Sequence, residues 1–249
     1  MRSRAGGEPD SRARPSYQPR RCFVLAVAVL LAVTAARALG VAGPDAVWVP
    51  LMTVLLVLIA WWCGMTSADL GLRRADVAAG FRYGGAACAL VLLVLGTAAV
   101  LPLTSGALRD ARGDISAGRL AYELVVTVVL LTAVPEEFAF RGVLLGSGIL
   151  LWGRLRSVLV VSALFGLWHV QPTLATMADN PAVGGLSASG WGRLVVVLGA
   201  VAATFLAGLV FAWLRLRSGS LVAAVIAHVA TNGLGLAVAW VVVHATGTG

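Results

Sequence analysis

The sequence predicts an all-α protein: a polytopic transmembrane helical bundle of about seven spans, with six to eight as the range. Its composition is 59% hydrophobic and 12% charged, and the mean hydropathy is +0.92. Soluble domains contain about 25% charged residues, so this chain has too few to cover a water-exposed surface. At about 20 apolar residues per span, a chain of 249 residues holds one membrane domain of this size.

Two regions differ in composition. Residues 1–21 contain six Arg, two acidic residues and three Pro, so we expect a disordered basic cytoplasmic tail. Residues 22–249 are expected to form a single transmembrane domain without an internal repeat. The first apolar segment, residues 22–36, follows a basic region, so a cleaved signal peptide is the alternative interpretation. We expect a retained span, because many further spans follow.

Six more apolar segments follow the first, separated by polar connections. Their approximate ranges are 46–66, 84–103, 119–151, 158–170, 193–214 and 220–244. The fifth segment of the chain, 158–170, is short for a full span. Pro135 lies in the middle of the fourth segment and is expected to kink that helix or loosen its hydrogen-bond ladder.

The positive charge indicates membrane topology rather than nucleic-acid binding. The net charge of +8 comes from 19 Arg, since the chain has no Lys, and most Arg flank apolar segments. With seven spans and the N-terminus inside, thirteen Arg lie on the inner side and five on the outer side, as the positive-inside rule requires. A composition rich in Arg, Ala, Val and Gly indicates a high-GC bacterial genome. We therefore expect a multi-pass protein of the bacterial inner (plasma) membrane with a cytoplasmic N-terminus.

Three cysteines occur, with no spacing that is typical of a metal site. Cys22, Cys63 and Cys88 lie in or at the edge of apolar segments. A disulfide framework or a zinc finger is therefore not expected. We interpret the three residues as buried small apolar side chains.

Polar and charged side chains inside the apolar segments mark the candidate functional site. Ionisable groups at membrane depth are costly, so their presence there indicates function. Three motifs occur on three separate segments: Glu136-Glu137-x-x-x-Arg141, Phe165-x-x-x-His169 and His228-x-x-x-Asn232. At 1.5 Å per residue they lie roughly 22, 16 and 12 Å from the inner ends of their segments, so they can meet in one cavity that opens toward the cytoplasm.

The two carboxylates of the first motif are expected to differ in role. Glu137 and Arg141 are i,i+4 neighbours and can form an ion pair, which makes a buried charge tolerable. Glu136 points about 100° away on the same helix and is free to face His169 across the cavity. A carboxylate that reaches a water molecule in this setting can act as a general base.

The third motif offers hydrogen-bond donors. His228 and Asn232 are also i,i+4 neighbours and share one helix face. An imidazole and a carboxamide side by side are plausible donors to the oxyanion of a tetrahedral intermediate. Taken singly, each residue has a structural interpretation, such as a helix–helix contact. This structural interpretation is less convincing for the set as a whole, because two of the three His in the chain fall within these motifs.

Together, the three motifs resemble those of the CPBP family of intramembrane proteases, the CAAX-protease and bacteriocin-processing group also called Abi. The resemblance covers about residues 119–236, which would form the protease-like core. It implies endopeptidase activity in the membrane, with Glu136 activating water with help from His169. By the same resemblance, His228 and Asn232 would stabilise the oxyanion, while Glu137 and Arg141 would hold the site together.

The resemblance leaves the metal requirement open, because family members are described both as metalloproteases and as metal-free glutamate peptidases. Zinc usually takes three protein ligands, which Glu136, His169 and His228 could supply. We favour the metal-free account and no cofactor, because Asn232 is a poor zinc ligand but a good oxyanion donor. The expected substrate is a membrane-embedded or lipidated peptide or protein, and the expected surroundings are the lipid bilayer.

Two other classes of function remain. A non-catalytic bacteriocin-immunity or scaffold protein of the same fold would be favoured by the loss of a motif residue, and none is missing. A proton-coupled transporter would use Glu123, Glu136 and the His residues as a relay. Inverted repeats with paired broken helices would favour a transporter, and Pro135 has no counterpart in the other half of the chain.

Overall fold

The computed structural model describes residues 17–40, 45–101, 113–177 and 181–245, and these residues form helices without a strand. The predicted all-α bundle is therefore confirmed. Most of the predicted tail, residues 1–16, lies outside the described residues, as do Arg109 and Arg112 in the polar connection that follows segment 84–103. Helix α1 begins at Pro19, so residues 19–21, assigned to the tail from the sequence, are helical instead. Proline is favoured in the first helical turn because its fixed φ suits a helix and its missing N–H would have no partner there.

Apolar helices long enough to cross a membrane account for most of the described chain. Five helical stretches qualify by length and composition: Pro19–Ala38, Ser67–Ala99, Ala117–Thr176, Gly190–Ser218 and Leu221–Ala245. The apolar helix Ala46–Trp62 is shorter. The 60-residue stretch is interrupted at Gly153, whose φ of 75° lies in the left-handed region that favours glycine. That stretch therefore contains two of the predicted segments, and the chain is a multi-pass membrane protein.

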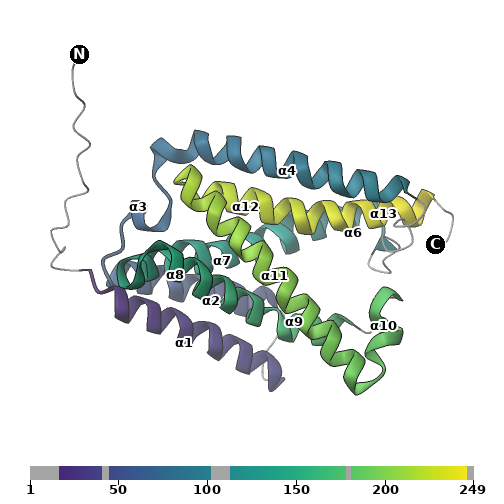
Figure 1. The fold of residues 1–249 in the computed structure, drawn as a ribbon, viewed down its shortest axis with the longest axis horizontal. Helices are drawn as coiled ribbons and strands as arrows, with labels where there is room; N and C mark the ends of the chain where they lie inside the picture. The colour runs from purple at the N-terminus through teal and green to yellow at the C-terminus, as the bar shows by residue number, and fades with distance from the viewer. Residues whose placement is uncertain (1–16, 41–44, 102–112, 178–180, 246–249) are drawn as a thin grey trace, which may run out of the picture.

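The helices are named here as in Figure 1. The α-helices are α1 (Pro19–Ala38), α2 (Asp45–Trp62), α3 (Ser67–Leu70), α4 (Val77–Val100), α6 (Ala117–Tyr122), α7 (Val134–Glu137), α8 (Leu145–Trp168), α9 (Val170–Thr176), α10 (Pro181–Ser187), α11 (Gly190–Ser218), α12 (Leu221–Val229) and α13 (Gly235–Ala245). A 3₁₀ turn, η1 (Arg74–Asp76), precedes α4. Three π-helical segments are η4 (Glu123–Ala133), η5 (Phe138–Leu144) and η7 (Ala230–Leu234).

The π-helical segments adjoin the predicted motifs. Pro135 lies in α7 between η4 and η5, which agrees with the expected loosening of the ladder, because proline cannot donate a backbone hydrogen bond. Segment η5 starts directly after Glu137, and η7 starts two residues after His228. Segments of π-helix are rare and frequently occur at functional sites. The backbone irregularity therefore coincides with the polar residues.

Small residues let the helices that carry the motifs approach closely. Helix α11 crosses between α8 and α12, and α12 lies along α4 (Figure 1). A Cβ atom built on Gly166 of α8 would lie 2.8 Å from the carbonyl oxygen of Val201 on α11, and one built on Gly208 would lie 3.1 Å from the Cα atom of Ser162. Such contacts are typical of helix packing in membranes. There is no hydrophobic driving force between helices in lipid, so small residues promote association by letting the backbones pack closely. They fix the end of α8 that bears the second motif.

Candidate active site

Glu137 is the centre of a fully buried charged cluster. Its side chain is 0% exposed, and Nη1 of Arg141, one helical turn later, donates a hydrogen bond of 2.9 Å to its Oε1. Nδ1 of His228 lies 2.8 Å from the same oxygen. A carboxylate only accepts hydrogen bonds, so Nδ1 carries the proton and donates the hydrogen bond to Glu137. The predicted ion pair between Glu137 and Arg141 is confirmed, and the cluster joins the first motif to the third.

Aromatic rings surround the guanidinium of Arg141. The distances from its central carbon to the ring centroids are 4.0 Å for Phe165, 5.2 Å for Phe211 and 5.8 Å for Phe140. Cation–π contacts of this kind are worth more where water is excluded, and Arg141 is only 1% exposed. The ring of Phe211 also stacks on His228 at 5.2 Å. The rings thus hold the arginine and the imidazole in fixed positions.

Glu136 differs from Glu137 in its partners. Nε1 of Trp168 donates a hydrogen bond of 2.9 Å to Oε1 of Glu136. The second oxygen, Oε2, is buried without a hydrogen-bond partner in the described part of the chain, and it lies 4.0 Å from Nε2 of His228. The side chain of Glu136 is 13% exposed, against 0% for Glu137. One carboxylate oxygen therefore stays free beside an imidazole nitrogen.

We expected His169 to face Glu136, and no hydrogen bond joins these two residues among those described. The adjacent Trp168 donates to Glu136 instead. His169 ends helix α8, where its Nδ1 lies 2.7 Å from the carbonyl oxygen of Phe165. Its ring contacts the Phe165 ring at 4.6 Å. The same phenyl ring lies 5.9 Å from the His228 ring, so Phe165 contacts both imidazoles.

Asn232 is the one predicted site residue whose side chain is exposed. The described part of the chain contains no hydrogen bond from this side chain to the other motif residues. The helix changes from α to π winding at Ala230, between His228 and Asn232. The four steps from His228 to Asn232 still make about one helical turn, so the exposure of Asn232 does not follow from the change of winding.

The positions of these residues do not suit a zinc ion. Within the described residues no group of three His, Cys, Asp or Glu side chains is placed to hold a metal. Of the three ligands considered from the sequence, Glu136 and His228 approach to 4.0 Å, whereas Nδ1 of His169 is taken by the carbonyl oxygen of Phe165. The arrangement presents a carboxylate and an imidazole to a water-sized group rather than three converging ligands.

Sequence analysis missed one polar partner, Trp168. It is adjacent to His169 in the second motif, and a tryptophan N–H inside a membrane span requires an acceptor. The need for an acceptor could have been inferred from the sequence, but the sequence does not indicate that Glu136 is the acceptor. Glu123, the other acidic residue of the fourth segment, forms an ion pair with Arg119. His244 is exposed and stacks on Trp240. Neither residue contacts the buried cluster.

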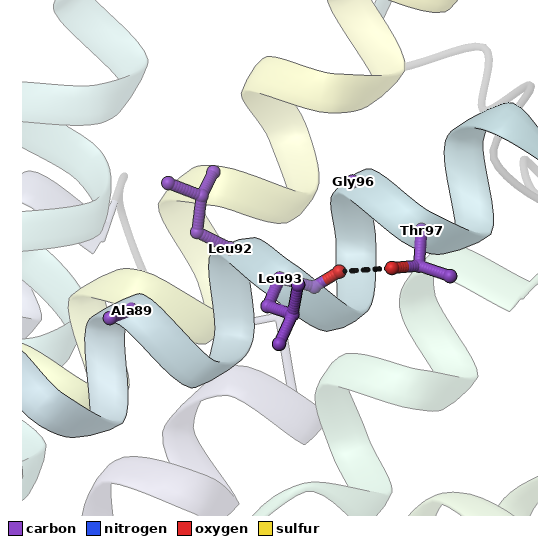
Figure 2. Close-up of a pocket in the computed structure, with 5 residues that line it drawn as sticks. All are labelled: Ala89, Leu92, Leu93, Gly96 and Thr97. Atoms are coloured by element: carbon purple, nitrogen blue, oxygen red, sulfur yellow. Dashed lines mark hydrogen bonds between the residues drawn. The ribbon is translucent and has the colours of Figure 1, made fainter.

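A hollow of about 480 Å³ lies away from the motifs, on helix α4. Its lining is Ala89, Leu92, Leu93, Gly96 and Thr97, shown in Figure 2. The Thr97 hydroxyl donates to the carbonyl oxygen of Leu93, so the one polar side chain of this lining is satisfied within its own helix. No ionisable group lines the hollow, so it is not a candidate catalytic site.

The fold defines the class of protein as a multi-pass α-helical membrane protein with a buried carboxylate–imidazole cluster. Residues 119–234 match the family described as type II CAAX prenyl endopeptidase Rce1-like. The matched range includes all six predicted site residues and confirms the resemblance to CAAX proteases. It supports a membrane-embedded protease. No curated protein and no solved structure matches the chain.

Proposed function

We propose that this protein is an intramembrane endopeptidase that hydrolyses peptide bonds of membrane-associated substrates with a water molecule activated by Glu136. The observation that carries the proposal is the free Oε2 of Glu136, buried and 4.0 Å from Nε2 of His228. Polar atoms at this separation suit a shared water molecule, which can contact both. The match to the Rce1-like family over residues 119–234 supports the same class of reaction.

The proposed reaction follows from these partners. Glu136 takes a proton from the water molecule, and the resulting hydroxide attacks the carbonyl carbon of the scissile peptide bond. The tetrahedral intermediate collapses with cleavage of the C–N bond, and Glu136 returns its proton to the departing amine. The hydrogen bond from Trp168 to Oε1 fixes the carboxylate so that Oε2 is the reactive oxygen.

His228 would stabilise the oxyanion. Glu137 accepts a hydrogen bond from Nδ1 of His228, which fixes the orientation of the ring. A proton on Nε2 of the fixed ring would be a donor to developing negative charge. Arg141 holds Glu137 in place. The pair Glu137–Arg141 is thus proposed to position His228 without contacting the substrate.

Two members of the predicted set have supporting roles in this proposal. If Nδ1 of His169 donates to the Phe165 carbonyl, Nε2 is left as an acceptor that can assist Glu136 with the water molecule. Asn232 would add a second oxyanion donor once substrate orders its exposed side chain. Neither role requires a metal ion, and we propose no cofactor.

The proposed substrate is a lipidated or membrane-embedded peptide or protein. A catalytic carboxylate between apolar helices can be reached by a substrate that already partitions into the bilayer. The proposed location is the bacterial plasma membrane, with the N-terminus in the cytoplasm, as the distribution of Arg predicts.

The deciding experiment is proteolysis by the purified full chain in liposomes, with a panel of prenylated and hydrophobic peptides. We expect cleavage by the wild type and by Glu123→Gln, a matched control whose carboxylate is paired with Arg119 away from the cluster. We expect none by Glu136→Gln. Equal cleavage by Glu136→Gln and wild type would overturn the mechanism. Absence of cleavage in every sample, with the proteins folded, would favour the immunity or scaffold alternative.

A further inference from the structure

A second hollow, of about 280 Å³, lies where α3 and η1 meet α8 and the end of α11. Helix α3, the start of α4 and the end of α11 lie at the same end of the bundle (Figure 1). Three Arg and two Asp line this basic hollow: Arg73, Arg154, Arg215, Asp69 and Asp76. None of them belongs to the three motifs, so the basic hollow is separate from the proposed protease site.

Arg215 is the buried charge of the basic hollow. Its side chain lies near the end of α11 and is only 8% exposed. Nη2 donates to the carbonyl oxygens of Ala68 at 3.3 Å and Asp69 at 3.1 Å, and Nε is buried without a partner in the described part of the chain. A guanidinium has five N–H donors, and these two bonds use at most two of them. Arg215 therefore keeps donors for an acceptor that the described residues do not supply.

The backbone fixes the place of this guanidinium. Gly71 has a φ of 73°, and a Cβ atom built on it would overlap Nε of Arg215. The carbonyl oxygen of Gly71 accepts a hydrogen bond of 2.8 Å from the N–H of Leu221, the first residue of α12. The turn after α3 is thereby tied to the start of α12, and the side chain of Arg215 is held against it.

The two carboxylates of the basic hollow have partners on their own turns. Oδ2 of Asp69 accepts hydrogen bonds of 2.7 Å from the N–H and from the hydroxyl of Thr66, in the capping box of α3. Oδ2 of Asp76 lies 3.6 Å from Nε of Arg73. Among the described residues, no ion pair joins either carboxylate to Arg154 or Arg215. The lining thus has more Arg than Asp, and two of its arginines are available to an anion.

One wall of the basic hollow is apolar and continues onto the exposed surface. Ile149 and Leu150 of α8 line it, and Leu150 is 56% exposed. Trp152, two residues further along, is exposed and packs edge-on against Phe23. Exposed tryptophans are typical of the level at which a bilayer meets water. The basic hollow therefore places arginines beside an apolar surface at the depth expected of lipid head groups.

We propose that the basic hollow binds the phosphate group of an anionic phospholipid. Arg154 and Arg215 would donate to the phosphate oxygens, since a guanidinium matches the geometry of phosphate. Ile149 and Leu150 would contact the glycerol and the start of an acyl chain. A water molecule takes about 30 Å³ in the liquid, so the volume suffices for a phosphate group and part of the glycerol. Basic pockets between membrane helices on the cytoplasmic side bind lipid head groups in this way, and the distribution of Arg predicts that this end is cytoplasmic.

The test is equilibrium binding to the purified full chain in detergent micelles, measured by native mass spectrometry and by thermal unfolding. Four ligands are compared: short-chain phosphatidylglycerol, phosphatidylcholine and diacylglycerol with the same acyl chains, and inorganic phosphate. We expect phosphatidylglycerol to bind most tightly and to raise the melting temperature, because it binds the folded chain. Diacylglycerol lacks the phosphate, and inorganic phosphate lacks the apolar part, so both should bind more weakly.

Matched variants on α8 show whether the basic hollow is the site. Arg154 and Arg156 are both exposed and two positions apart, but only Arg154 lines the basic hollow. Arg154→Gln should weaken phosphatidylglycerol binding by about ten- to a hundredfold, the usual loss for a hydrogen bond to a charged group. Arg156→Gln should leave it unchanged. Arg215→Lys keeps the charge but loses the planar fork and should also weaken binding, with the exposed Arg217→Lys as its control.

Three results would overturn the proposal. The first is equal affinity of Arg154→Gln and Arg156→Gln for phosphatidylglycerol, which decides the matter even where Arg215→Lys fails to fold. The second is diacylglycerol or phosphatidylcholine that binds as tightly as phosphatidylglycerol, because an anionic head group would then not be recognised. The third is inorganic phosphate of equal affinity, which would make the ligand a soluble anion. Since no lining residue belongs to the motifs, lipid binding and proteolysis can succeed or fail independently.

Discussion

Trp168 donates a hydrogen bond of 2.9 Å to Glu136 across a separation of 32 residues in the chain. This bond joins the first motif to the second and leaves one oxygen of Glu136 available next to His228. The guanidinium of Arg37 on α1 lies over the Trp168 ring, 5.4 Å from its centroid. The N-terminal helix, which lies outside the three motifs, thereby reaches the second of them.

Replacing Trp168 by Phe should impair turnover more than substrate binding. The substitution keeps an aromatic ring beneath Arg37 but removes the donor to Glu136. A hydrogen bond to a charged group is worth about 1.5–3 kcal/mol, so kcat should fall by about tenfold or more. KM should change little. Steady-state kinetics checks this, with Trp191→Phe, an exposed tryptophan at the start of α11, as the control.

Replacing Glu136 by Gln should lower kcat by about 10²–10⁴-fold, the usual contribution of a general acid–base group. The amide preserves size and can still accept from Trp168, so folding should be unaffected. Rates measured under single-turnover conditions in liposomes provide the test. A residual rate above about a tenth of the wild type would rule out Glu136 as the base.

Breaking the buried ion pair should reduce stability as well as activity. Glu137→Ala leaves the charge of Arg141 buried without its carboxylate, which typically costs about 3–5 kcal/mol. The double variant Glu137→Gln/Arg141→Met removes both charges and should recover most of that stability. Activity should stay low in the double variant, because an amide at position 137 does not replace the carboxylate that fixes the ring of His228. Denaturation in detergent micelles, followed by the cleavage assay, separates the two effects.

Gly166→Ala should destabilise the bundle. The added Cβ would lie 2.8 Å from the Val201 carbonyl oxygen, a backbone atom that cannot move by a side-chain rotation. Overpacking of this kind costs about 1–3 kcal/mol. Gly199→Ala on α11 is the matched control, since its Cβ would meet no atom within 4 Å. The melting temperature should fall for the first variant and stay level or rise for the second.

Metal chelation should leave cleavage intact. The described residues do not converge on a zinc ion at the motifs, and the proposed mechanism uses none. Cleavage rates before and after prolonged dialysis against a strong chelator should agree within the error of the assay. Loss of activity that zinc restores would replace the proposed mechanism with a metal-assisted one.

The fold class could be predicted because composition alone excludes a soluble chain, and apolar length alone sets the number of segments. The ion pair of Glu137 and Arg141 was also predictable, because both lie on one helix at a spacing that fixes their distance. Local spacing could not show which groups on other helices His169 and Asn232 would meet. In the structure His169 hydrogen-bonds the Phe165 carbonyl oxygen of its own helix, and the side chain of Asn232 is exposed.

The sequence by itself determined which residues are polar within the membrane segments, and therefore where chemistry is possible, because an unpaired charge at that depth is too costly to persist without a role. Only the tertiary structure decided which of them meet. Pairing Glu136 with Trp168 and Glu137 with His228 depends on how α7, α8 and α12 approach one another. Glycines such as Gly166 and Gly208 let α8 and α11 cross closely, through contacts between positions that no local periodicity connects.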